Sequence, residues 1–224
     1  MMAVFEIADK IRKANEGGWV NNPSDVGGET AFGWSRKFWP KLRIWPIIDG
    51  YKKQFTTAPA YGTSAYRNWS KAFNGVLRHD ATLMKYVDQA FKEVFWDANR
   101  IGMIENQEIA NWLYDHAVNA GGRGIRWMQL AAKVAPDGSI GPKTLVAINT
   151  SDPTRLLQRA EDIAGAYRLD RAHEDPSQIG FLMSWLKRDG QPESILEHVR
   201  QLSRDGELDK EEVALLKNEM EGTA

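Results

Sequence analysis

The feature of the sequence that most constrains the fold is the recurrence of apolar residues at helical spacing, with almost no alternation typical of strands. The first such segment, residues 3–15, places on one face Val4, Ile7, Ala8, Ile11 and Ala14. Further helical patterns cover residues 81–97, 107–118, 126–133, 142–149, 154–171, 178–188 and 194–202. Residues 17–35 are rich in Gly and Asn, which predicts turns or a short hairpin. We therefore predict a mainly α fold.

The composition excludes several kinds of site. A chain of 224 residues suits one large domain or two small ones. It contains no Cys, which excludes a disulfide framework, a thiol nucleophile and Cys-ligated metal centres. Its four His residues are never three to five positions apart, so we expect no His-based metal site.

The formal net charge of −1 conceals two segments of opposite charge. Residues 36–78 carry nine Lys and Arg against one acid, Asp49, a net charge of +8, and they are also rich in aromatic residues. Residues 190–224 carry nine Asp and Glu against four Lys and Arg, a net charge of −5. Either segment can be explained as an exposed, solvated face of the protein. The basic segment has a second explanation, which is that it attracts a polyanion.

A pair of acidic residues near the N-terminus suggests acid–base chemistry. Glu16 follows the first predicted helix, where the negative end of the helix dipole disfavours ionisation and raises the pKa of a carboxyl group, as a general acid requires. Asp25 lies nine residues further on, and the glycine-rich segment between them is expected to turn the chain back so that the two carboxylates lie close together. Thr30 is placed to hold a water beside Asp25, and Glu29 is a rival second carboxylate. The alternative is that Glu16 is an exposed helix end and Asp25 part of an Asx-turn.

These residues resemble a known family. The run Glu16-Gly17-Gly18, followed by Asp25, Gly27-Gly28, Thr30 and Gly33, is similar to the glycoside hydrolase family 108 muramidases, which are phage endolysins and related bacterial lysozymes. Phe95-Trp96-Asp97 resembles a later motif of the same family. Three further segments resemble its companion type 3 peptidoglycan-binding domain: residues 115–121, 137–145 and 181–188.

The resemblance is not complete. Trp34-Ser35 stands where the family usually has Ile-Thr, and Ser184 replaces a Gly. Residues 36–78 and 190–224 do not follow the family pattern. These departures affect the expected substrate preference more than the expected reaction.

The resemblance implies a lysozyme-like helical catalytic domain with a short turn or hairpin after its first helix, followed by a helical peptidoglycan-binding domain. We place the catalytic domain at residues 1–98, with residues 36–78 as a basic aromatic variant segment. The peptidoglycan-binding domain covers residues 99–189, and an acidic helical extension covers residues 190–224.

The expected reaction is hydrolysis of the β-1,4 bond between N-acetylmuramic acid and N-acetylglucosamine. By resemblance to phage-type lysozymes, Glu16 protonates the leaving oxygen, while Asp25 and Thr30 position the attacking water, which gives inversion. If Glu29 is the second carboxylate instead, the acid assignment still holds. No metal or organic cofactor is expected.

Aromatic rings match the flat C–H faces of sugars, so four residues are predicted to line the glycan cleft: Trp19, Trp34, Phe95 and Trp96. Three other tryptophans lie on helical stripes and are predicted to pack in the core: Trp112, Trp127 and Trp185. Asn119, in the segment Asp115–Gly121, is predicted either to hydrogen-bond buried backbone or to contact substrate where the two domains meet.

The expected partner is bacterial peptidoglycan, and we expect a monomer without nucleic-acid binding or stable membrane association. No secretory signal is recognised in residues 1–15, so the protein is expected to be made in the bacterial host cytoplasm and to act on the wall after release. Two alternatives remain: a non-catalytic wall-binding or secretion-associated protein that keeps the fold, and a single-strand nucleic-acid binder that uses residues 36–78.

Overall fold

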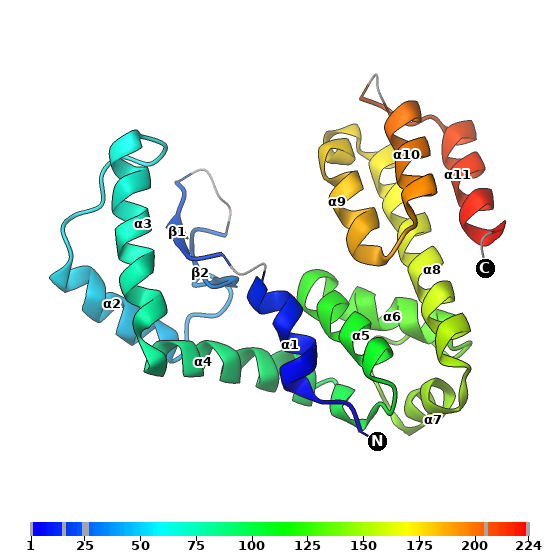
Figure 1. The fold of residues 1–224 in the computed structure, drawn as a ribbon, viewed down its shortest axis with the longest axis horizontal. Helices are drawn as coiled ribbons and strands as arrows, with labels where there is room; N and C mark the ends of the chain where they lie inside the picture. The colour runs from blue at the N-terminus through cyan, green and yellow to red at the C-terminus, as the bar shows by residue number, and fades with distance from the viewer. Residues whose placement is uncertain (1, 15–16, 24–26, 204–205, 223–224) are drawn as a thin grey trace. The chain divides into compact units, whose positions relative to one another are not determined.

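The computed structural model describes residues 2–14, 17–23, 27–203 and 206–222, and it confirms a mainly α fold (Figure 1). The chain divides into two compact units. One consists of residues 5–98, and the other of residues 1–4 together with residues 99–224. Each unit is described by itself.

The first unit begins with helix α1 (Phe5–Ala14) and a small antiparallel sheet. Its strands β1 (Trp19–Asn21), β2 (Glu29–Ala31) and β3 (Trp34–Ser35) pair in chain order, so the expected short hairpin is one part of a three-stranded meander. The register places Thr30 between Val20 and Ser35. Because side chains alternate along a strand, Thr30 and its neighbour Glu29 point to opposite faces of this sheet.

The helices that follow are α2 (Ile44–Gln54), α3 (Ser64–His79) and α4 (Ala81–Phe91), so the basic segment contains two regular helices. Asp80 separates the last two: its side chain accepts a hydrogen bond from the Leu83 backbone N–H at 2.9 Å, and this bond is the main reason that its pKa is lowered. Tyr51 of α2 also donates to the Asp80 carboxylate at 2.9 Å. One N-cap therefore joins three helices of this unit.

The helix expected over residues 81–97 changes type part-way. After Phe91 the chain widens into the π-helix η1 (Lys92–Asp97). A π-turn carries more residues per turn than an α-turn, so it changes the direction of the side chains that follow. Within η1, Phe95 stacks on Trp34 with ring centroids 5.6 Å apart, and Trp96 meets the edge of Phe5 at 5.7 Å.

The second unit is helical in its described residues. In chain order its α-helices are α5 (Gln107–Ala120), α6 (Gly122–Ala131), α7 (Pro142–Thr150), α8 (Pro153–Glu174), α9 (Ile179–Asp189), α10 (Glu193–Leu202) and α11 (Lys210–Gly222). Short 3₁₀ turns, η2 (Ile101–Met103) and η3 (Pro176–Gln178), precede α5 and α9. The long helix α8 packs against α6, α9 and α11.

The acidic C-terminal segment is part of the packed structure of this unit. Apolar residues of α10 and α11 form one buried cluster with residues of α8 and α9, including Leu169, Leu182, Val199 and Leu216. The acidic residues therefore lie on helices whose other faces are core. Over the residues that the structure describes, we find no helix with the length and apolar character needed to cross a membrane.

Candidate functional site

The two acidic residues of the predicted site, Glu16 and Asp25, lie outside the described residues. The structure does describe the elements on either side of them. Glu16 belongs to the connection between α1 and β1, and Asp25 to the connection between β1 and β2. The predicted partner Thr30 lies on β2 itself.

The end of α1 is fixed by a group of charged residues that we call the α1 clamp: Asp9, Arg12, Lys13 and Asp88. Arg12 binds both carboxylate oxygens of the fully buried Asp9, at 2.5 and 2.8 Å, and reaches Asp88 of α4 at 2.6 Å. Lys13 pairs with Asp88 at 2.7 Å; burial alone would lower its pKa, but the two carboxylates raise it. The clamp fixes the last turn of α1 to α4, within a few residues of Glu16.

The start of β1 is fixed by Asn74, a residue of α3 that the sequence analysis did not single out. Its side-chain amide accepts a hydrogen bond from the Trp19 N–H at 2.5 Å and donates to the Trp19 carbonyl at 3.0 Å. The amide also occupies the space above Gly18, where a Cβ would overlap it. A side chain at the second glycine of the motif would therefore displace Asn74 from its hydrogen bonds to Trp19.

The rival carboxylate Glu29 is in contact with three donor side chains. One oxygen accepts hydrogen bonds from the Trp19 indole N–H at 2.6 Å and from Lys52 at 2.9 Å, and the other lies 2.8 Å from Nε of Arg36. Arg36 also binds Asp49 through two hydrogen bonds, which raise the pKa of Arg36 and lower that of Asp49. Glu29 thus joins the sheet to residues of the basic segment.

Thr30, in contrast, is only weakly engaged. Its hydroxyl is half-buried and lies 3.4 Å from the Gly28 carbonyl, at the far limit of hydrogen bonding. Ser35, its neighbour across β3, donates to the Gly27 carbonyl at 2.6 Å. The two hydroxyls therefore lie beside the Gly27-Gly28 pair that follows Asp25.

The four aromatic residues predicted to contact glycan have packing roles in the structure. Three of the indoles are buried, with exposed fractions of 4% for Trp19, 2% for Trp34 and 4% for Trp96. Trp19 packs between Trp69 and Phe73, and Phe95 is half-buried on Trp34. Sugar binding through these rings stays a prediction.

Exposed aromatic rings occur instead in the basic segment. The exposed fraction is 64% for Phe38, 44% for Tyr61 and 39% for Trp39. Trp39 also meets the edge of Trp34 at 5.1 Å, so it is held on a rigid base. The sequence analysis noted the aromatic content of this segment, but periodicity could not separate its exposed rings from its buried ones.

In the second unit, Asn119 is exposed and its amide donates to the Asp115 carbonyl one turn earlier, at 2.7 Å. The predicted hydrogen bond from Asn119 to backbone is therefore present, but Asn119 lies at the surface and not in the buried interior. Asp115 pairs with Arg188 of α9 at 2.8 Å. These contacts join α5 to α9, and a role for Asn119 in substrate binding stays a prediction.

A buried charged group in the same unit was not anticipated, and we call it the α9 cluster: His116, Arg168 and Asp189. Asp189 is fully buried and lies 2.9 Å from Nε2 of His116 and 3.2 Å from Nε of Arg168. The Arg168 guanidinium also lies over the rings of Trp127 and Trp185, at 5.0 and 5.1 Å. The cluster therefore ties α5, α8 and α9 together.

The Asp-Gly motif of this unit forms a tight turn. Asp137 accepts hydrogen bonds from the Gln129 amide at 2.7 Å and from the Ser139 N–H at 2.8 Å, and the Gln129 bond is the main cause of its lowered pKa. Gly138 has φ of 81°, which favours glycine. Among the described residues, no three His, Asp or Glu side chains are grouped as metal ligands.

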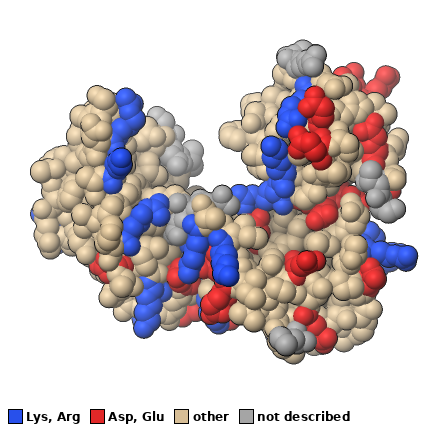
Figure 2. All heavy atoms as spheres, in the orientation of Figure 1, with Lys and Arg blue, Asp and Glu red and all other residues tan. Residues whose placement is uncertain are grey.

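Charged residues are distributed differently over the two units. On the face drawn in Figure 2, acidic side chains gather over α10 and α11. Basic side chains on the unit of residues 5–98 are spread out on this face, with no single patch. The ion pairs of Arg36 and Lys52 show that part of the basic segment serves internal contacts.

Comparisons with known proteins give two consecutive family matches, which meet near residue 122 and not at the boundary between the two units. A family model described as Glycosyl hydrolase 108 matches residues 10–121, half of the chain. A second, described as Predicted Peptidoglycan domain, matches residues 123–190. Among curated proteins, the comparison finds no match.

One solved structure shows a similar fold. It is titled as the structure of Brucella abortus SagA, and it matches with a TM-score of 0.51 at 21% sequence identity. The match covers 92% of this chain and 97% of that chain.

Proposed function

The chain belongs to the glycosyl hydrolase 108 family, and from this premise we propose that it cuts the β-1,4 bond between N-acetylmuramic acid and N-acetylglucosamine. The peptidoglycan domain that follows supports the same substrate, and the two matches together make the chain a peptidoglycan hydrolase. In this proposal Glu16 is the general acid, and Asp25 with Thr30 positions the attacking water.

The observation that carries the assignment of Glu16 is the anchoring of the chain on both sides of it. The α1 clamp holds Arg12 against α4, and Asn74 holds Trp19 against α3. These two anchors hold the described chain on either side of the short connection that contains Glu16. A general acid gains from such anchoring because proton transfer depends on a fixed geometry relative to the substrate.

The contacts of Glu29 favour Asp25 as the second carboxylate. Glu29 already accepts hydrogen bonds from the Trp19 indole N–H and from Lys52, and it forms an ion pair with Arg36. It also points to the face of the sheet opposite Thr30. A carboxylate that activates water needs an oxygen available to that water, which the contacts of Glu29 restrict, whereas the weakly engaged Thr30 hydroxyl lies beside Gly28, three residues after Asp25 in the sequence.

The glycan contacts are proposed to combine the predicted rings with exposed ones. Trp39 is exposed and packs on Trp34, so a sugar face on Trp39 would be supported by the buried indole behind it. Action on the wall after release from the cytoplasm remains part of the proposal.

Product analysis tests the proposed reaction. Purified protein is incubated with bacterial sacculi, and the released fragments are examined by mass spectrometry for the sugar at the reducing end. We expect N-acetylmuramic acid there, with the α-anomer appearing first by NMR, as inversion of a β-linkage requires. N-acetylglucosamine at the reducing end would contradict the bond assignment, and release of peptide alone would contradict the glycosidase assignment.

Two variants test the second carboxylate in the same assay. Asp25→Asn is expected to lower the rate of glycan release by about 10²-fold or more. Glu29→Gln is expected to lower the rate less, and in proportion to its effect on stability. The reverse order of effects would move the role of base to Glu29.

A further inference from the structure

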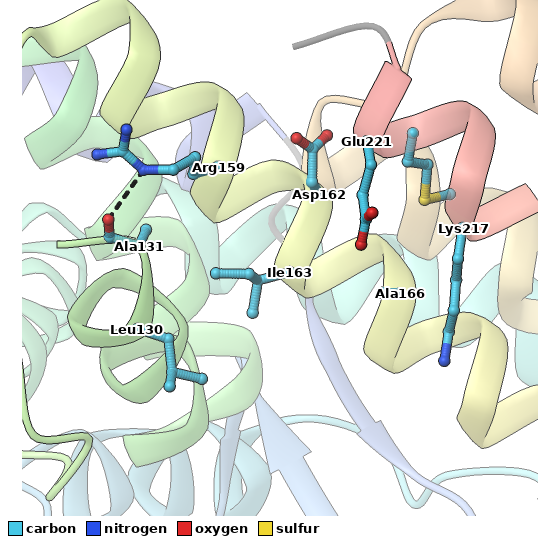
Figure 3. Close-up of a pocket in the computed structure, with 9 residues that line it drawn as sticks. Leu130, Ala131, Arg159, Asp162, Ile163, Ala166, Lys217 and Glu221 are labelled. Atoms are coloured by element: carbon cyan, nitrogen blue, oxygen red, sulfur yellow. Dashed lines mark hydrogen bonds between the residues drawn. The ribbon is translucent and has the colours of Figure 1, made fainter. Parts of the chain in front are cut away.

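The second unit contains a cavity of about 290 Å³ between α6, α8 and α11 (Figure 3). This volume is close to the lower limit of about 300 Å³ for small-molecule sites. Four residues of α8 line it at spacings of three and four residues, so they form one face of that helix: Arg159, Asp162, Ile163 and Ala166. Leu130 of α6, which is exposed, and the buried Met220 of α11 are the apolar lining residues on the other two helices.

One side of the cavity carries a cation without a carboxylate partner. Arg159 donates through Nε to the Ala131 carbonyl at 3.0 Å, as the dashed line in Figure 3 shows. This bond orients the guanidinium, and over the residues that the structure describes its terminal nitrogens form no ion pair. Such a group is ready to bind a carboxylate through two parallel hydrogen bonds.

The other side carries two acids that repel each other. Asp162 of α8 and Glu221 of α11 both line the cavity, and Figure 3 draws them across from each other between the two helices. Burial is the main reason that the pKa of Asp162 is raised; hydrogen bonds from Gln158 and Gln191 oppose this, and the charge of Glu221 makes the smallest contribution. The cation Lys217 points away along α8 and pairs with Asp170. Within the described residues, Glu221 has no cationic partner.

We propose that this cavity binds a short peptide with one free ammonium and one free carboxylate. This is the chemistry of a peptidoglycan stem peptide that contains a diamino acid. The carboxylate binds Arg159, the ammonium lies between Asp162 and Glu221, and the aliphatic chain covers Ile163 and Leu130. The choice of stem peptide rests on the proposed function, whereas the charge pattern stands on the geometry.

The arrangement of charges selects this ligand over a glycan segment. A bound ammonium would relieve the repulsion between Asp162 and Glu221, which a neutral hydroxyl cannot do. Arg159 and Asp162 are three residues apart on α8, and Figure 3 draws their side chains toward different sides of the cavity, so an extended peptide is needed to reach both. The site also depends on α11, which lies beyond the peptidoglycan-domain match of residues 123–190.

The test is a calorimetric titration of the full chain with the probe N-acetyl-L-alanyl-D-isoglutaminyl-L-lysyl-D-alanyl-D-alanine, whose one ammonium is on lysine and whose one carboxylate is at the C-terminus. Arg159→Gln and Glu221→Gln are each expected to weaken binding about 10-fold or more, since each removes a charged hydrogen bond. Acetylation of the lysine amine of the probe is expected to weaken it similarly.

Matched controls lie on the same two helices. Arg155→Gln on α8 and Glu211→Gln on α11 remove exposed charges outside the cavity, and both are expected to bind the probe within about twofold of the unchanged protein. Unchanged affinity in Arg159→Gln and Glu221→Gln, or no binding of the probe by the unchanged protein at millimolar concentration, would overturn the proposal.

A second assay separates this proposal from the proposed function. Glycan strands stripped of peptide by an amidase still contain the bond that we assign to the enzyme, and Arg159→Gln is expected to cut them at an unchanged rate. Cleavage of stripped strands without peptide binding would overturn the cavity assignment and leave the glycosidase assignment intact. Peptide binding without cleavage of stripped strands would overturn the glycosidase assignment and leave the cavity assignment intact.

Discussion

The two units of the molecule each bury an Arg–Asp cluster, but the two clusters occupy different places relative to the predicted chemistry. In the α1 clamp, Arg12 binds the fully buried Asp9 and fixes the helix end that precedes Glu16. In the α9 cluster, Arg168 and His116 bind the fully buried Asp189 in the interior of the second unit. The same chemistry therefore fixes the helix end before the proposed general acid in one unit and holds helices together in the other.

This comparison predicts different consequences for stability and turnover. Loss of either cluster is expected to lower the free energy of unfolding, because a buried charge is left without its partner. Only loss of the α1 clamp is expected to change the rate of glycan cleavage in molecules that remain folded. The following predictions test that difference in order of decreasing effect.

The largest effect on stability is expected for Asp189→Asn. The change leaves Arg168 and His116 buried without their carboxylate, which costs about 3–5 kcal/mol in the free energy of unfolding. Urea unfolding measures the loss, and Glu174→Gln at the exposed end of α8 serves as the control. If the kcat of the folded variant on stripped glycan strands falls by more than about twofold, the α9 cluster also affects the rate of cleavage, and the claimed difference between the clusters is wrong.

Arg12→Met is expected to act on both stability and rate. Methionine keeps part of the packing on Phe91 but removes the cation, at a cost of about 2–3 kcal/mol, since Lys13 still reaches Asp9 at 3.4 Å. Displacement of the helix end is expected to lower kcat about 10- to 100-fold with little change in KM. Steady-state kinetics on soluble glycan strands would show the split, and an equal fall in stability with kcat preserved would reduce the clamp to a structural role.

Asn74→Ala should have a smaller effect of the same kind. It removes both hydrogen bonds to the Trp19 backbone, which costs about 1–3 kcal/mol, and frees the start of β1. We expect kcat to fall by about 10-fold, measured beside the exposed control Asn68→Ala on the same helix. A kcat that matches the control would show that Trp19 is held in place without Asn74.

The smallest effect concerns pH and the surroundings of the α9 cluster. Burial, with added repulsion from Asp162 and Asp189, raises the pKa of Glu161 to about 7. Because the folded protein keeps a proton that the unfolded chain has released, stability falls as pH rises from about 4.5 to about 7. Glu161 is only half-buried, so screening limits the effect to about 1 kcal/mol.

Glu161→Gln removes this dependence. The variant is expected to be more stable than the unchanged protein at pH 8 and to differ little from it at pH 5, by thermal unfolding. Parallel pH profiles for the two proteins would contradict the proton uptake that we assign to Glu161.

The sequence predicted the helical fold well because helical periodicity is a local property. The helices at 107–120, 142–150 and 153–174 begin and end within a few residues of the predicted bounds. The π-helix at 92–97 was not predicted, because its apolar pattern continues that of α4. The third strand was not predicted either, because a two-residue strand has too few residues for alternation to be seen.

The support of the candidate site was less predictable, because it depends on distant partners. Asn74 contacts a backbone 55 residues away, and Arg12 contacts Asp88 at a separation of 76 residues. Nothing local in an amphipathic helix shows that one amide will bind a strand. Glu29 remained a rival to Asp25 for the same reason, since Lys52 lies 23 residues away in sequence.

The most direct test of the central claim is the rate at which Glu16→Gln releases glycan fragments from sacculi. Glutamine keeps the shape of the side chain and removes its proton, so we predict a loss of about 10²- to 10⁴-fold with an unchanged midpoint of unfolding. Glu6→Gln, on the exposed face of α1, provides the matched control and is expected to retain full activity. Retained activity in Glu16→Gln, with the same fragments released, would contradict the account.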